Sequence, residues 1–188
     1  QCAENLSLLA APSSLDRIYD FEPEAFAQII DTAQRSAPLL VLDLPHMWSG
    51  WAKNTLVRAD EVVITAAPEL ANLRNTKNMV DMLKKLRPND PPPKLILNQV
   101  GTPKRPEITT NDFSEPLGLT PMAVIPFEPQ LFGNAANNGR MLGEMDAKSP
   151  VVAMIGEIAH VLTGRSELKT KRKPGLGSII DRLKLKKK

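Results

Sequence analysis

The chain has 188 residues, 42% hydrophobic and 4% aromatic, enough for one domain with a core built mainly from aliphatic side chains. Its single cysteine, Cys2, excludes an intrachain disulfide framework, and neither a membrane-spanning run nor a secretory signal pattern is present. We therefore expect a soluble, cytoplasmic protein. Residues 165–188 hold ten basic and two acidic residues, a charge of +8, so the preceding residues carry −5 of the net +3.

Five short apolar runs bounded by turn residues or proline predict five β-strands. The runs are residues 6–12, 39–43, 62–68, 94–100 and 122–127. We expect residues 39–43 to form a fully buried central strand, because every residue before its terminal aspartate is apolar.

Helical spacing of apolar residues and proline or acidic starts predict helices between these runs. The segments are a helix opening at Glu22 and ended by Pro38, then 53–59, 69–86, 109–117 and 151–162. Two faces are expected to point inward: Phe26, Ile29, Ile30 and Ala33 in the first helix, and Leu70, Leu73, Met79, Val80, Leu83 and Leu86 in the third. This alternation predicts an α/β domain over residues 1–164, a mostly parallel sheet with helices on both faces, followed by a basic tail.

Asp43 ends the predicted central strand and precedes the helix-breaking Pro45. Ligands of open α/β sheets collect at the carboxyl ends of the strands, which makes Asp43 a candidate binding residue. Capping of the following segment is an equal alternative for an aspartate in this position.

Five blocks of the sequence resemble the C-terminal part of the CpaE/TadZ pilus-assembly proteins, a branch of the MinD/ParA family of deviant Walker ATPases. They are residues 43–46, 58–64, 68–75, 97–100 and 124–127, in the order and spacing of that family. The resemblance implies a P-loop NTPase fold, ATP and Mg²⁺ as cofactors, ATP hydrolysis and a homodimer. It further implies a cytoplasmic protein, at the inner membrane face or a cell pole, that organises the secretion machinery of a type IV (Flp/Tad) pilus.

The resemblance also implies roles for individual residues. Asp43 matches the Walker B/switch II aspartate that holds the water shell of Mg²⁺. Asn98 matches the residue that hydrogen-bonds adenine, since an amide both donates and accepts, and Pro126 and Phe127 match the segment that walls the base. A strand-end turn residue is the alternative for Asn98, and core or turn packing is the alternative for Pro126 and Phe127.

The sequence departs from that family in its phosphate-binding loop. It holds no Gly-Lys-Ser or Gly-Lys-Thr, and no glycine occurs before Gly50. Without backbone N–H groups and a lysine around the phosphates, ATP binding loses its main contacts. We expect a fragment that begins after the loop or, as the second possibility, a degenerate member acting as a non-catalytic scaffold. A ParA-like DNA-segregation ATPase is a third reading, which the net negative charge of residues 1–164 disfavours.

The loop after Asp43 carries His46, Trp48 and Trp51, and in the MinD/ParA family this loop responds to nucleotide and forms the dimer contact. Exposed tryptophans suit an interface, and packing on the preceding helix is an equal alternative for them.

The tail after Gly164 has the pattern of a basic amphipathic segment on an anionic membrane surface. Its apolar residues are Leu176, Ile179, Ile180 and Leu183, with Lys184 and Lys186 among the basic ones. A solvated tail and non-specific contact with nucleic acid are the alternatives.

Overall fold

The computed structural model describes residues 4–10, 22–45 and 48–164 of the chain. The chain divides into two compact units, Gln1–Ala59 and Asp60–Lys188.

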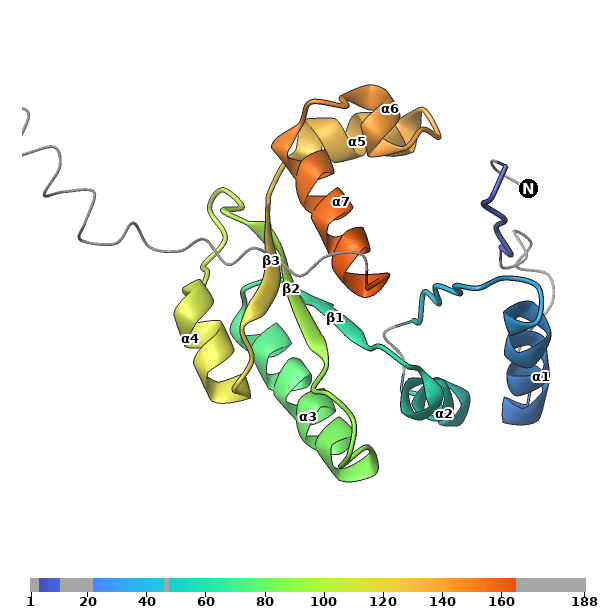
Figure 1. Ribbon diagram of the computed structural model, residues 1–188. Helices are drawn as coiled ribbons and strands as arrows, with labels where there is room; N and C mark the ends of the chain where they lie inside the picture. The colour runs from blue at the N-terminus through green and yellow to red at the C-terminus, as the bar shows by residue number, and fades with distance from the viewer. Residues whose placement is uncertain (1–3, 11–21, 46–47, 165–188) are drawn as a thin grey trace, which may run out of the picture. The chain divides into compact units, whose positions relative to one another are not determined.

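A parallel sheet of three strands forms the centre of the second unit (Figure 1). The strands are β1 (Val63–Ala66), β2 (Lys94–Val100) and β3 (Pro121–Pro126), in the spatial order β1-β2-β3. Both pairings are parallel, with Ile64 opposite Leu95 and Leu97 opposite Val124. The carboxyl ends of all three strands therefore lie at one edge of the sheet.

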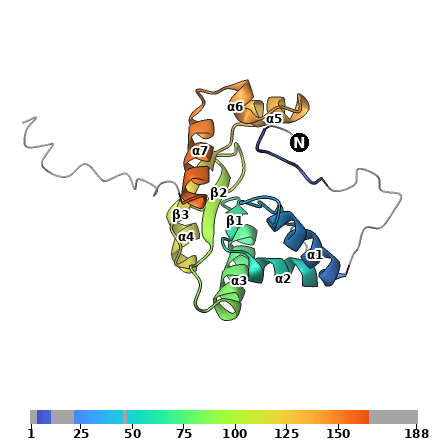
Figure 2. The same ribbon diagram turned by 45° about the vertical axis from the view of Figure 1, so that its right-hand side comes forward.

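Helices follow each strand of this sheet. They are α3 (Leu70–Leu86), α4 (Thr110–Ser114) with the 3₁₀ turn η1 (Glu115–Leu117), α5 (Pro129–Asn137), α6 (Leu142–Met145) and α7 (Pro150–Leu162). Helix α7 starts at Pro150 behind a buried Ser149, whose hydroxyl accepts the N–H of Val151 at 3.2 Å. Helices α5 and α6 lie side by side in both views (Figures 1 and 2).

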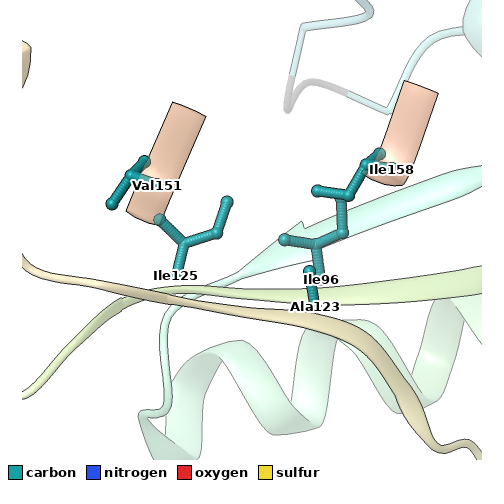
Figure 3. Packing of buried hydrophobic residues seen from close by; sticks show 5 residues of the cluster. All are labelled: Ile96, Ala123, Ile125, Val151 and Ile158. Atoms are coloured by element: carbon teal, nitrogen blue, oxygen red, sulfur yellow. The ribbon is translucent and has the colours of Figure 1, made fainter. Parts of the chain in front are cut away.

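Helix α7 covers one face of the sheet with aliphatic side chains. Val151 and Ile158 from α7 meet Ile96 of β2 and Ala123 and Ile125 of β3 (Figure 3). All five side chains are buried, and the alternation along β2 turns the neighbouring leucines to the opposite face.

The opposite face of the sheet packs against the α3 side of the unit (Figures 1 and 3). Leu95 and Leu97 of β2 are completely buried, as are Val80 of α3 and Phe113 of α4. Helix α3 contacts both β1 and η1. These side chains form the second core layer, so the expected sheet with helices on both faces is confirmed.

The first unit contains α1 (Pro23–Gln34) and α2 (Gly50–Arg58). The rings of Phe26 and Trp51 stack with their centroids 4.2 Å apart and their planes 13° from parallel. Arg58 and Asp31 form an ion pair at 2.8 Å. Helix α1 has no buried residue, so the expectation of a buried face on this helix is wrong.

The two strands predicted at 6–12 and 39–43 are not strands in the described residues. Both segments are exposed: Leu8 is 73% exposed and Val41 is 83% exposed. Apolar composition alone does not make a strand, because a strand needs a neighbour to take its backbone hydrogen bonds. The described sheet ends at β1 and offers residues 39–43 no such pairing.

The remaining predicted elements are confirmed, with different bounds or burial. Residues 62–68, 94–100 and 122–127 contain β1, β2 and β3, and the other predicted helices are present. In α3, Leu70 and Leu86 are exposed although they were expected inside, whereas Thr76 is buried. Helices α5 and α6 had no counterpart among the predicted elements.

Candidate functional site

A β-bulge at the end of β2 shapes the carboxyl edge of the sheet. Leu97 pairs with Val124 and Val100 with Pro126, so two residues of β2 face one residue of β3. The two residues are Asn98 and Gln99, and Gln99 has a positive φ of 56°. The N–H of Gln99 donates to Oδ1 of Asn98 at 2.8 Å.

The turn after β2 is closed by one carboxylate. Glu107 accepts the N–H of Gly101 at 2.9 Å and the N–H of Thr102 at 3.0 Å. The guanidinium of Arg105 lies 2.8 Å from the same carboxylate. The Gly101 N–H, followed by the Arg105 side chain, holds the pKa of Glu107 below its ordinary value, since both favour the charged form.

Arg105 joins this turn to the bulge and to the end of β1. Its guanidinium donates to the backbone carbonyl of Gln99 and, at 3.1 Å, to the side-chain oxygen of Gln99. It also lies 3.2 Å from Glu69, which directly precedes α3. The N–H of Ile108 donates to the carbonyl of the buried Pro68 at 3.0 Å. The segment after β2 is thereby fixed beside the carboxyl end of β1.

The end of β3 closes the other side of this edge. The N–H of Phe127 donates to the carbonyl of Val100 at 2.9 Å, immediately after the bulge. Pro126 is exposed and Phe127 is half-buried. Asn98, Pro126 and Phe127, which come from two distant parts of the sequence, therefore lie on adjacent strand ends.

Asp43 does not have the setting that was expected for it. Asp43 is exposed and lies outside any strand. The prediction of a carboxylate at the end of a buried strand is therefore wrong. It belongs to the first unit, whereas Asn98, Pro126 and Phe127 belong to the second.

The candidate interface residues differ from one another. Trp51 is partly covered by its stacking on Phe26 of α1, whereas Trp48 is 54% exposed. His46 and the tail residues Leu176, Ile179, Ile180, Leu183, Lys184 and Lys186 lie outside the described residues.

The sequence reasoning missed the residues that hold the bulge, namely Gln99, Arg105, Glu107 and Glu69. A charged pair between Pro103 and Ile108, in a segment with a glycine at its start, was the available signal. The sequence pattern does not show which backbone groups Arg105 and Glu107 bind, because these contacts depend on the geometry of the turn.

The described residues also hold features that bear on the kind of site. No group of three or more His, Cys, Asp or Glu side chains is arranged there to hold a metal ion. A surface hollow of about 320 Å³ lies at the amino ends of the strands, lined by Val62, Leu83, Arg87 and residues 90–93 among others. It is at the end of the sheet opposite to Asn98.

Within the described residues, no helix combines the length and apolar character that crossing a membrane requires. The longest of the helices named above, α3, has 17 residues and carries several charged side chains.

Comparison with known proteins identifies the fold. No protein-family profile matches the sequence, and no curated protein matches it significantly. Among solved structures, a ParA family ATPase from Chlorobium tepidum superposes with a TM-score of 0.72 and 19% identity, over 86% of this chain and 66% of that one. MinD in its complex with MinC from Aquifex aeolicus gives 0.65 and 21%, over 80% and 62%. The cell division ATPase MinD of Pyrococcus furiosus gives 0.64 and 18%, over 77% and 60%.

The protein thus has the α/β fold of the ParA and MinD ATPases, with a parallel sheet and helices on both of its faces. The chain spans less than two thirds of the length of each of these structures.

Proposed function

We propose that this chain is part of a pilus-assembly protein of the CpaE/TadZ type, an ATP-dependent dimerisation switch that organises a Flp/Tad pilus secretion apparatus. The observation that carries the proposal is the position of Asn98, Pro126 and Phe127 on adjacent strand ends at one edge of the sheet. The resemblance assigned these residues to a base site from separate sequence blocks, and a ParA/MinD fold supports the assignment.

The residues present suit the base of ATP better than its phosphates. Asn98 lies at the end of β2, and the half-buried Phe127 follows the adjacent end of β3, with its N–H bonded to Val100. An amide and an aromatic ring are groups that suit a purine. The sequence holds no Gly-Lys-Ser or Gly-Lys-Thr to surround phosphates. Asn98, Pro126 and Phe127 would hold adenine. The resemblance separately assigns Asp43, in the first unit, to the water shell of Mg²⁺. Bound Mg²⁺ would neutralise phosphate charge.

The dimer and the location of the protein belong to the same proposal. The fold is shared by MinD, which forms a complex with MinC in Aquifex aeolicus. Trp48 is exposed and large enough to anchor a contact. The proposed dimer interface is formed by His46, Trp48 and Trp51, of which Trp51 belongs to α2 rather than to a loop. A position at the cytoplasmic face of the inner membrane or at a cell pole follows from the CpaE/TadZ assignment.

A non-catalytic scaffold is the second candidate. The lack of a phosphate-loop motif in the sequence favours it, because the partner-binding surface of such a fold does not need hydrolysis. A ParA-like role in DNA segregation fits less well, since residues 1–164 carry a net charge of −5 within the total of +3.

Nucleotide titration tests the proposal. We expect Mg-ATP to bind the wild-type chain weakly, through its base, because the phosphates lack their main contacts. The affinity should fall about tenfold in Asn98→Ala, as the loss of a base hydrogen bond predicts. Asn111→Ala, which removes an exposed amide in α4, is the matched control and should bind as the wild type does. Isothermal calorimetry or NMR titration gives the constants. If Mg-ATP binds neither this chain nor a longer form that includes a phosphate loop, the switch is ruled out and the scaffold is favoured.

A further inference from the structure

The side-chain amide of Asn98 has a defined orientation. Its Oδ1 accepts the N–H of the next residue, Gln99, at 2.8 Å. Among the described residues, its Nδ2 group has no hydrogen-bond partner, so two N–H donors remain available. The Nδ2 group of Asn98 can therefore donate a hydrogen bond to a ring-nitrogen acceptor of a base, such as N7 of a purine.

This orientation depends on an unfavourable backbone conformation. The φ of Gln99 is 56°, in the left-handed region where a residue with a Cβ atom is uncommon. Because Leu97 and Val100 are fixed by their pairing with β3, a negative φ at Gln99 requires a compensating rotation of the Asn98–Gln99 peptide. That rotation would turn the N–H of Gln99 away from Oδ1 of Asn98. Other groups must therefore hold Gln99 in place.

Arg105 supplies the direct contacts to Gln99. Its guanidinium donates to both the backbone carbonyl and the side-chain oxygen of Gln99, the latter at 3.1 Å. The Arg105 side chain is only 18% exposed, and Thr102 adds a hydroxyl bond to the same carbonyl at 2.8 Å. A planar guanidinium can make these contacts together, whereas a lysine ammonium reaches fewer of them.

Glu107 fixes the guanidinium in turn. Its carboxylate lies 2.8 Å from Nη2 of Arg105 and accepts the N–H groups of Gly101 and Thr102. Glu69 contacts the other side of the guanidinium at 3.2 Å. The two carboxylates hold Arg105 between the ends of β1 and β2.

We propose that Arg105 and Glu107 are positioning residues that orient the Asn98 amide to donate to N7 of a purine. The inference rests on the proposed function, since it concerns the same site. A hydrogen bond from Asn98 to N7 selects purines in general, because adenine and guanine share the N7 acceptor.

The test compares adenosine with 7-deazaadenosine, which lacks the N7 acceptor, by NMR titration of the whole chain. We expect the wild type to bind adenosine roughly fivefold tighter, the effect of one hydrogen bond. Arg105→Met should bring the ratio of the two dissociation constants close to one, as should Asn98→Ala. Lys77→Met, which removes an ion pair on α3, is the matched control and should keep the wild-type ratio.

Arg105→Lys, which keeps the charge, gives a second readout if Arg105→Met does not fold, and its ratio should lie between those of the wild type and Asn98→Ala. A wild-type ratio retained in both folded Arg105 variants would overturn the positioning role and leave the proposed function intact. Equal binding of the two nucleosides by the wild type would overturn the N7 contact alone. Failure of the wild type to bind either nucleoside would overturn both proposals.

Discussion

At the scale of single residues, Glu107 combines three contacts in one carboxylate. It accepts two backbone N–H groups and pairs with Arg105, and all of these favour its charged form. Because Arg105 also faces Glu69, protonation of Glu107 would leave the guanidinium with one carboxylate partner instead of two.

The lowered pKa of Glu107 predicts a pH dependence of stability. Its pKa in the folded chain lies below the ordinary 4.5, so its contribution is present above that value and is lost as the pH falls through the folded pKa. We expect the free energy of unfolding to decrease below about pH 4.5, and to decrease less in Glu107→Gln. Urea unfolding from pH 7 to pH 3 measures this.

Glu157→Gln is a suitable control for this measurement, because Glu157 is exposed on α7. The account of Glu107 is wrong if Glu107→Gln and Glu157→Gln follow the same curve as the wild type.

At the scale of elements, α7 shows how one helix serves both the core and the surface. Ile158 belongs to the cluster with Ile96 and Ala123 (Figure 3). Its side chain is 9% exposed, whereas Ile155 on the same helix is 38% exposed. The two residues share their chemistry and their helix, so a difference between their variants reports burial.

We expect Ile158→Ala to reduce the free energy of unfolding by about 2–4 kcal/mol, through lost transfer energy and a cavity beside Ile96. Ile155→Ala should cost about 1 kcal/mol or less. Chemical denaturation followed by circular dichroism measures both values. Equal losses in the two variants would contradict the packing described for α7.

At the scale of the whole molecule, charge is distributed unevenly along the chain. Residues 165–188, outside the described part, hold ten of the 24 basic residues, and the rest of the chain has a net negative charge. The proposed membrane contact therefore depends on this tail.

We expect the intact chain to sediment with vesicles that contain an anionic phospholipid, and a chain ending at Gly164 to remain in the supernatant. Raising the salt concentration should release the intact chain, since the attraction is screened. Vesicles of neutral phosphatidylcholine are the control. Equal sedimentation of the two chains with anionic vesicles would rule out the tail as the membrane contact.

Much of the fold could be predicted from local sequence patterns. The bounds of β2 agree with the apolar run at 94–100, and α7 follows its apolar spacing to within one residue. Periodicity and proline positions determine such elements because they depend on neighbouring residues. The candidate site was only partly predictable: Asn98, Pro126 and Phe127 came from the family resemblance, whereas Arg105 and Glu107 were not found.

The sequence by itself determined the α/β class and the position of most helices and strands, through periodicities that act over a few residues. Only the tertiary structure decided that residues 39–43 are not a strand, since pairing requires a neighbour that composition cannot supply. It also decided that Phe127 lies beside the bulge at Asn98 and that Arg105 holds Gln99. The first contact follows from the register of β2 and β3, and the second from the geometry of the turn after β2, neither of which local composition specifies.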